Sequence, residues 1–438
     1  MMCGVSRTAP HSRQCAGRGG IVLGVGAVTV LGVPRRAVAQ VSVGVAASGR
    51  RLGRSSRPVR WRLVGERALL AAGPIVAIGF FVSACARGDL AVDFMGPYLH
   101  GARDVWAGMS PYHPDELANG VAFVYPPLAA YAVAPFLLLP PLATEIVVSI
   151  LAAAACFGAL RLVGVRDRRC YVLAFGSPVM FFSIQAGNIS VLVTLGAALL
   201  WRYRDRRLAA LGAGLLIALK LYTWPLLLFF LVTRRGRSAA LAAASAMAGV
   251  FLPWAVLGFA GLTSYPQLLS RLSQFKQGGS YTVGALIARV APWPVAHAVT
   301  YLLAALVLVW MARGRGDART FSAALGLMVL LAPLVLYDYF GVLFVALGVM
   351  RCGYGWEWMA PLLLWLSPSI GRGSALQLAL VLGVVGLVWI KATSTDNTLS
   401  EPAALPELND TLLSQLSARL ARRPAIEASL RAGSTASS

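Results

Sequence analysis

Apolar runs of about 20 residues recur along most of this chain, and they limit the folds that it can adopt. The sequence is 58% hydrophobic and only 13% charged, whereas soluble proteins carry roughly 25% charged residues. Inside a bilayer every backbone N–H and C=O must be hydrogen-bonded internally, so apolar runs of this length cross as helices. The sequence therefore predicts an all-α, polytopic integral membrane protein of the cell membrane.

The net charge of +22 comes from arginines in short clusters between the apolar runs. This pattern is typical of cytoplasmic loops, and it predicts about 12 transmembrane segments with both termini in the cytoplasm. A basic domain interleaved with aromatic residues is absent from the sequence, which argues against a nucleic-acid partner. The surrounding partner that we expect is the lipid bilayer.

The two ends of the chain differ in composition from the middle. Residues 1–60 are rich in Arg, Gly and Ser, and their apolar run Ile21–Val33 is too short to span. We interpret 1–60 as a disordered or mis-started N-terminal extension, with a signal peptide as the alternative. Residues 61–392 are the predicted transmembrane domain, and 393–438 are a predicted polar cytoplasmic tail with a short amphipathic helix.

A polar, aromatic-rich segment, Asp93–Pro127, follows the first long apolar run, Leu63–Ala86. Basic residues precede that run and almost none follow it, which places the N-terminus in the cytoplasm and Asp93–Pro127 outside. We refer to Asp93–Pro127 as the first outer loop. A second outer loop is expected at Gly261–Trp293.

Three later units each have basic residues at both ends and polar residues near the middle. If both ends of a unit are cytoplasmic, each unit is a hairpin whose limbs reach only about 18–24 Å, less than the ~30 Å hydrocarbon core. The polar tips should then lie within the outer half of the bilayer and line a cavity. The tips are Gln185–Asn188, Lys220, and the segment from Pro333 to Asp338.

Ionisable residues at membrane depth are costly and usually functional, and the candidates are Asp93, Lys220 and Asp338. A carboxylate can deprotonate a hydroxyl nucleophile, and an ammonium can neutralise a phosphate leaving group. This pairing fits glycosyl transfer from a lipid-phosphate sugar, with Asp93 as the catalytic base and Lys220 as the ligand of the donor phosphate. A single carboxylate suffices for a single displacement with inversion.

The motifs of other chemistries are absent from the sequence. It contains no P-loop and no GxGxxG after a strand, which argues against a soluble nucleotide donor. Its six cysteines form no CxxC, and its four histidines form no metal-ligand pair by spacing. We therefore expect no metal and no cofactor.

Simpler structural roles stay open for the same residues. Asp93 could cap the following helix, and Lys220 could extend along a helix to the membrane surface. The amides could join helices by hydrogen bonds, and the loop tyrosines could be interfacial aromatics. The residues concerned are Gln185, Asn188, Tyr98, Tyr112 and Tyr125. A non-catalytic transporter or flippase of lipid carriers is the competing function, because such proteins also use intramembrane charge and broken helices.

Several segments resemble glycosyltransferase family 87. The first outer loop carries Asp93, Tyr98, Ala102-Arg103, Gly108, Pro111-Tyr112 and Tyr125-Pro126-Pro127 in the order of the family's first outer loop. The later segments that resemble the family are Gln185-x-Gly187-Asn188, Ala218-Leu219-Lys220 with Pro225 and Arg234-Arg235, and Pro333 through Asp338-Tyr339.

The resemblance implies an enzyme of the GT-C type that uses a polyprenyl-phosphate sugar, often mannose, on the extracytoplasmic face. Its acceptor would be a lipid or a glycan. By motif position the resemblance implies Asp93 as the base. The substrate-binding residues that we expect around it are Tyr98, Arg103, Tyr125, Gln185, Asn188, Tyr337 and Asp338.

Overall fold

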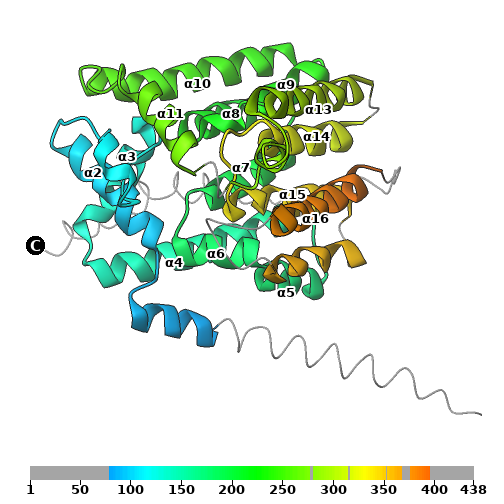
Figure 1. Cartoon of the computed structure of the whole chain (residues 1–438), viewed down its shortest axis with the longest axis horizontal. Coiled ribbons are helices and arrows are strands. Elements are labelled where there is room, and N and C mark those ends of the chain that lie inside the picture. Colours follow the sequence, from blue (N-terminus) through cyan, green and yellow to red (C-terminus); the bar gives the residue numbers. More distant parts are fainter. Residues whose placement is uncertain (1–77, 277–279, 314–315, 352, 367–374, 395–438) are drawn as a thin grey trace, which may run out of the picture. The chain divides into compact units, whose positions relative to one another are not determined.

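The computed structural model describes residues 78–276, 280–313, 316–351, 353–366 and 375–394 (Figure 1). All of them belong to one compact unit, Arg57–Ser438. The predicted extension 1–60 and the predicted amphipathic helix of the tail lie outside the described residues. Within the described ranges every regular element is a helix, which confirms the all-α class.

Among the described residues, three helices are long and apolar enough to cross a membrane: α4 (Pro141–Leu162), α10 (Gly236–Val256) and α13 (Trp293–Arg313). Fewer than half of the residues in each apolar window are buried inside the protein. Helices that are apolar all round but so little buried fit a lipid environment. The chain is therefore a multi-pass membrane protein, while the number of about 12 crossings stays a prediction.

The three predicted hairpins appear as helices that break at their polar centres. In the first, α5 (Arg168–Gly176) and α6 (Pro178–Ala186) precede a 118° bend into α7 (Ser190–Arg202). In the second, α8 (Arg207–Leu219) ends at Lys220, and η4 (Leu221–Thr223) and α9 (Leu226–Val232) follow. In the third, α14 (Asp317–Leu330) leads through 331–336 to η6 (Tyr337–Phe340) and α15 (Gly341–Met350).

Local sequence explains the first two breaks. Gly187 ends α6 in the left-handed region with φ 63°, which favours glycine. A Cβ on Gly187 would lie 2.9 Å from Val148 of α4 and 3.1 Å from Ala91, just before the first outer loop. The Gly187 N–H donates to carbonyls of the preceding turn of α6. At the second break, Lys220 has extended backbone, and its carbonyl accepts hydrogen bonds from the N–H and the hydroxyl of Thr223. Neighbouring residues of the chain thus supply hydrogen bonds at both breaks.

The basic ends of the hairpins meet on one face. Asp317, at the start of α14, accepts hydrogen bonds from Arg204 (3.1 Å) and Arg235 (2.7 Å). Arg235 also donates to Asp205 at 2.7 Å. The loops after α7 and α9 and before α14 thus lie together, as expected if all three hairpins start and end on the same side of the membrane.

The first outer loop folds into short helices: η1 (Phe94–Tyr98), α2 (Leu99–Trp106), η2 (Pro114–Leu117), and beyond it α3 (Pro127–Val133) and η3 (Ala134–Leu138). These elements share an apolar cluster with the end of α10 and with α11 (Tyr265–Lys276) of the second outer loop (Figure 1). The two outer loops therefore pack together at one end of the helices.

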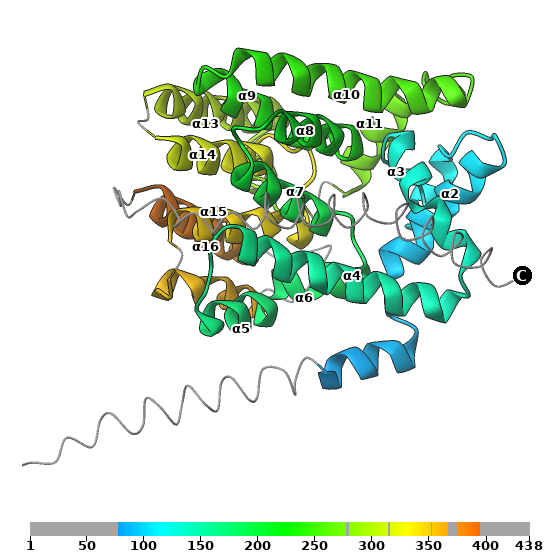
Figure 2. The same ribbon diagram turned by 180° about the vertical axis from the view of Figure 1, so that it is seen from behind.

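The helices of the three hairpins build most of a second apolar cluster, together with α4 and α13. The remaining elements also contribute to it: α12 (Val283–Ile287), η7 (Trp356–Trp358), η8 (Ala360–Leu366) and α16 (Ala375–Ser394). Figure 2 shows α8 beside α10. Gly214 permits this close approach, because a Cβ there would collide with the carbonyl of Ala242.

Candidate active site

The first outer loop and the three helix breaks meet in one chain of polar side chains. Asn188 donates from Nδ2 to Asp93 Oδ2 at 2.8 Å and accepts at Oδ1 from Lys220 Nζ at 3.1 Å. Lys220 Nζ also donates to Ser190 Oγ, which donates to Asp338 Oδ2 at 2.5 Å. Asp338 and Lys220 form an ion pair at 3.6 Å. Four segments far apart in the sequence thus converge on one network.

Asp93 opens η1, but its carboxylate makes no capping hydrogen bond to that helix. The carboxylate instead accepts a hydrogen bond from the side-chain amide of Asn188. The carbonyl of Gln185 accepts from the N–H of Ala91 at 2.6 Å, which holds the start of the loop against the first break. The capping role considered from the sequence is therefore not the one that positions this carboxylate.

Lys220 is 2% exposed, so it does not extend to the membrane surface. Its ammonium lies over the rings of three tyrosines, at 5.2 Å from the centroid of Tyr125, 5.9 Å from Tyr222 and 4.8 Å from Tyr339. A buried cation needs such compensation, because leaving water costs several kcal/mol, and aromatic faces attract cations. The site therefore holds a fixed positive charge beside Asp93.

A cavity of about 260 Å³ opens onto this network. Asp93, Asn188 and Lys220 line it, whereas Asp338 is not among its lining residues. Asp338 therefore contacts the Lys220 ammonium on the side away from the cavity, while Lys220 belongs to the cavity lining. The other walls come from both outer loops and from the second and third breaks, and they include Tyr98, Leu117, Tyr125, Tyr222, Tyr265, Leu269, Pro333 and Tyr339.

Of the loop tyrosines, Tyr98 and Tyr112 are buried and Tyr125 is half-buried. Tyr98 is fully buried and stacks on Tyr125 with ring centroids 4.8 Å apart. Tyr112 donates its hydroxyl to the carbonyl of Tyr125 at 3.0 Å. Burial raises the pKa of Tyr98 and of Tyr112 above the ordinary value, so both remain neutral phenols at physiological pH. Tyr98 lines the cavity as a neutral side chain, and Tyr112 supports Tyr125 from outside the lining.

Residues 123–336 match the model of glycosyltransferase family 87.

The chain carries a glycosyltransferase family 87 domain.

No curated protein and no solved structure matches the chain. The family 87 domain contains Tyr125, Asn188 and Lys220, while Asp93 precedes it and Asp338 follows it. The assignment of Asp93 to this site therefore rests on its contacts with the domain, in particular the hydrogen bond from Asn188.

Four residues expected to bind substrate do not line the cavity. Asp338 is ion-paired with Lys220 at 3.6 Å but is not among the lining residues. Arg103 is exposed on α2. Gln185 donates to the carbonyl of Asp89 at 3.4 Å. Tyr337 packs between Phe182 and Tyr281, with centroids 6.2 Å and 4.6 Å away. All four belong to the predicted segments, but their side chains have other surroundings than the cavity.

Four further residues of this candidate site were not predicted: Ser190, Tyr222, Tyr265 and Tyr339. Ser190 lies just after the first bend, where its N–H donates to Asn188 Oδ1 at 2.9 Å. Tyr222 and Tyr339 lie within two residues of a predicted polar residue, and their rings are tilted with centroids 4.5 Å apart. Proximity to Lys220 and Asp338 in the sequence was the available signal for these two.

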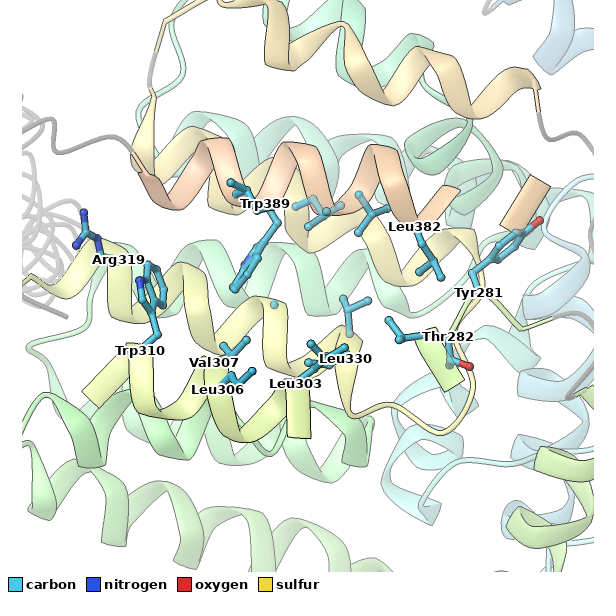
Figure 3. A pocket seen from close by; sticks show the side chains of 17 residues that line it. Tyr281, Thr282, Leu303, Leu306, Val307, Trp310, Arg319, Leu330, Leu382 and Trp389 are labelled. Atoms are coloured by element: carbon cyan, nitrogen blue, oxygen red, sulfur yellow. The ribbon is translucent and has the colours of Figure 1, made fainter. Parts of the chain in front are cut away.

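A larger cavity, of about 580 Å³, lies between α13, α14 and α16 (Figure 3). Its lining is almost wholly apolar, and Arg319 is the one charged side chain among the lining residues. Trp310, Leu330 and Trp389 lie along its walls (Figure 3). Such a surface suits hydrocarbon, and its lining residues include no carboxylate.

Proposed function

We propose that this protein is a membrane glycosyltransferase of the GT-C type. It transfers a sugar, for which mannose is our expectation, from a polyprenyl phosphate to an extracytoplasmic lipid or glycan acceptor. One observation carries the proposal: a carboxylate and a buried ammonium, Asp93 and Lys220, are held on either side of the Asn188 amide at the wall of one cavity. Family 87 membership supports it.

The proposed reaction uses the two charges separately. Asp93 takes the proton of the acceptor hydroxyl while the oxygen of that hydroxyl attacks the anomeric carbon of the sugar. The bond between that carbon and the phosphate oxygen breaks, and the polyprenyl phosphate leaves with the electron pair. Lys220 stabilises the negative charge on the departing phosphate. Because attack and departure occur in one displacement, the configuration at the anomeric carbon is inverted.

The position of the cavity supports a lipid-linked donor. Two of its walls come from helix breaks at Asn188 and Lys220, and others come from the outer loops. Irregular backbone at membrane depth is tolerated where it lines a cavity. A polyprenyl phosphate would place its headgroup at this boundary and leave its chain in the bilayer.

The test is transfer by purified full-length protein in detergent, with polyprenyl-phosphate mannose as donor and an extract of cell-envelope glycolipids as acceptor. We predict that Asp93→Asn lowers the rate at least ~100-fold, as loss of a general base does, while donor binding is kept. Product is measured by mass spectrometry. Parallel reactions with other polyprenyl-phosphate sugars test the choice of mannose.

Asp89→Asn is the matched control, because Asp89 lies in the same region but pairs with Arg87 at the surface, at 3.1 Å. It should transfer at the wild-type rate. Wild-type transfer by Asp93→Asn would remove the proposed base. Failure of the wild-type protein with every polyprenyl-phosphate sugar would remove the donor class.

A further inference from the structure

A second group of ionisable side chains gathers in the first outer loop, away from the cavity. His100 and Asp104 are one turn apart on α2, while His113 precedes η2 and Glu116 belongs to it. His100 Nε2 lies 3.0 Å from Glu116 Oε1 and 3.8 Å from Asp104 Oδ2, and His113 Nε2 lies 3.2 Å from Asp104 Oδ2. None of the four lines the cavity.

These separations are those of ligands around one ion. The donor atoms of His100, Asp104 and His113 all lie within 4.8 Å of one another. Around a tetrahedral Zn²⁺ with bonds of about 2.0–2.2 Å, neighbouring ligand atoms are roughly 3.3–3.6 Å apart. The three measured distances bracket that value. Both histidines also present the same nitrogen, Nε2, toward the carboxylates.

Hydrogen bonds alone leave this group incompletely satisfied. A neutral imidazole has one N–H, so His100 Nε2 can serve only one of the two carboxylates beside it. Glu116 Oε2 is buried and has no hydrogen-bond partner among the described residues. Asp104 is only 7% exposed. Buried carboxylate oxygens are normally paired, and a cation would satisfy both carboxylates at once.

The types of ligand atom in this group indicate which cation it would bind. Two carboxylates and two neutral imidazoles balance a divalent charge. Imidazole suits zinc and its neighbours in the first transition series, while Mg²⁺ and Ca²⁺ prefer oxygen-only ligands. His100 and His113 are partly exposed, with side chains 35% and 40% accessible, so an ion can enter from the aqueous side.

We propose that His100, Asp104, His113 and Glu116 form a Zn²⁺ site in the first outer loop. The expectation from sequence spacing that the histidines form no metal-ligand pair is revised, because α2 and η2 fold against each other. The ion joins α2 to η2, whose last residue Leu117 lines the active-site cavity. It therefore fixes the cavity wall and takes no part in the chemistry at Asp93.

The experiment measures metal content, independently of transfer, so it can fail or succeed separately from the proposed glycosyltransferase activity. Full-length protein is purified without a polyhistidine tag, stripped with EDTA and dialysed against Zn²⁺. Retained zinc is then measured by mass spectrometry. We expect one equivalent per chain in the wild type and loss of that equivalent in H100A/H113A.

His297→Ala is the matched control, because His297 packs on Trp293 and Tyr301 of α13 and should retain zinc like the wild type. If H100A/H113A does not fold, Co²⁺ replaces Zn²⁺ on the wild-type protein, and the visible absorption of a tetrahedral site is measured with and without Glu116→Gln. Wild-type protein that keeps no more metal than H100A/H113A, or that gives no Co²⁺ absorption, overturns the proposal. Equal zinc loss in His297→Ala also overturns it.

Discussion

Lys220 is the residue whose substitution best separates donor binding from acid–base chemistry. Hydrogen bonds to charged groups contribute about 1.5–3 kcal/mol, so loss of the ammonium should raise the donor KM roughly 10- to 100-fold. We predict this result for Lys220→Met, with a smaller rise for Lys220→Arg, which keeps the charge. Initial rates against donor concentration provide the measurement.

Loss of the ammonium also leaves Asp338 buried without its 3.6 Å ion-pair partner, which can destabilise the fold. K220M/D338N is the control, because it removes both charges and keeps the volume nearly constant. Its thermal unfolding should resemble that of the wild type, and its donor KM should stay raised. An unchanged donor KM in either folded variant would show that Lys220 does not bind the phosphate.

For single residues, the sequence could predict the depth of a side chain in the membrane but not which other side chains it contacts. Asp93, Asn188 and Lys220 were predictable because each interrupts or borders an apolar run at a known distance from basic residues. The sequence did not show which face of α2 would be buried: Ala102 is buried, while its neighbour Arg103 is exposed. No spacing rule showed that Ser190 would join Lys220 to Asp338.

At the scale of the elements, the bend at Gly187 sets the position of Asn188. The left-handed backbone costs an L-residue about 1–2 kcal/mol, and a Cβ would also press on Val148 and Ala91. We predict that Gly187→Ala lowers the melting temperature and reduces transfer more than it reduces the amount of folded protein. Fluorescence-detected unfolding and the transfer assay measure the two effects.

Gly212→Ala is the control for this prediction. Gly212 lies within α8, a Cβ there meets nothing within 4 Å, and alanine is the better helix former. This variant should be as stable as the wild type or slightly more so. If the two alanine variants behave alike, the bend is not set by Gly187.

The helix breaks were the most predictable part of the fold, and the reason is physical. Limbs of about 12–16 residues between basic ends cannot cross the hydrocarbon core twice, so a turn must occur near the polar centre. By contrast, the described part of the apolar stretch after Arg351 forms only the short helices η7 and η8, which its apolar composition alone does not predict.

For the whole molecule, the contact of three basic loops constrains the topology. Arg204 and Arg235 share Asp317, so the loops that carry them lie on one face. The network around Lys220 lies at the tips of the same hairpins, opposite their basic ends. Because arginines are in excess on the first face, we predict from the positive-inside rule that this face is cytoplasmic and that the candidate site lies on the outside.

This assignment predicts opposite labelling of two exposed positions, Asn119 in the first outer loop and Arg206 before α8. In a chain whose six own cysteines are replaced, Asn119→Cys should react with a membrane-impermeant maleimide in intact cells. Arg206→Cys should react only after permeabilisation, because the bilayer excludes the charged reagent. The reverse pattern would place the site in the cytoplasm, and equal labelling of both in intact cells would contradict a membrane between them.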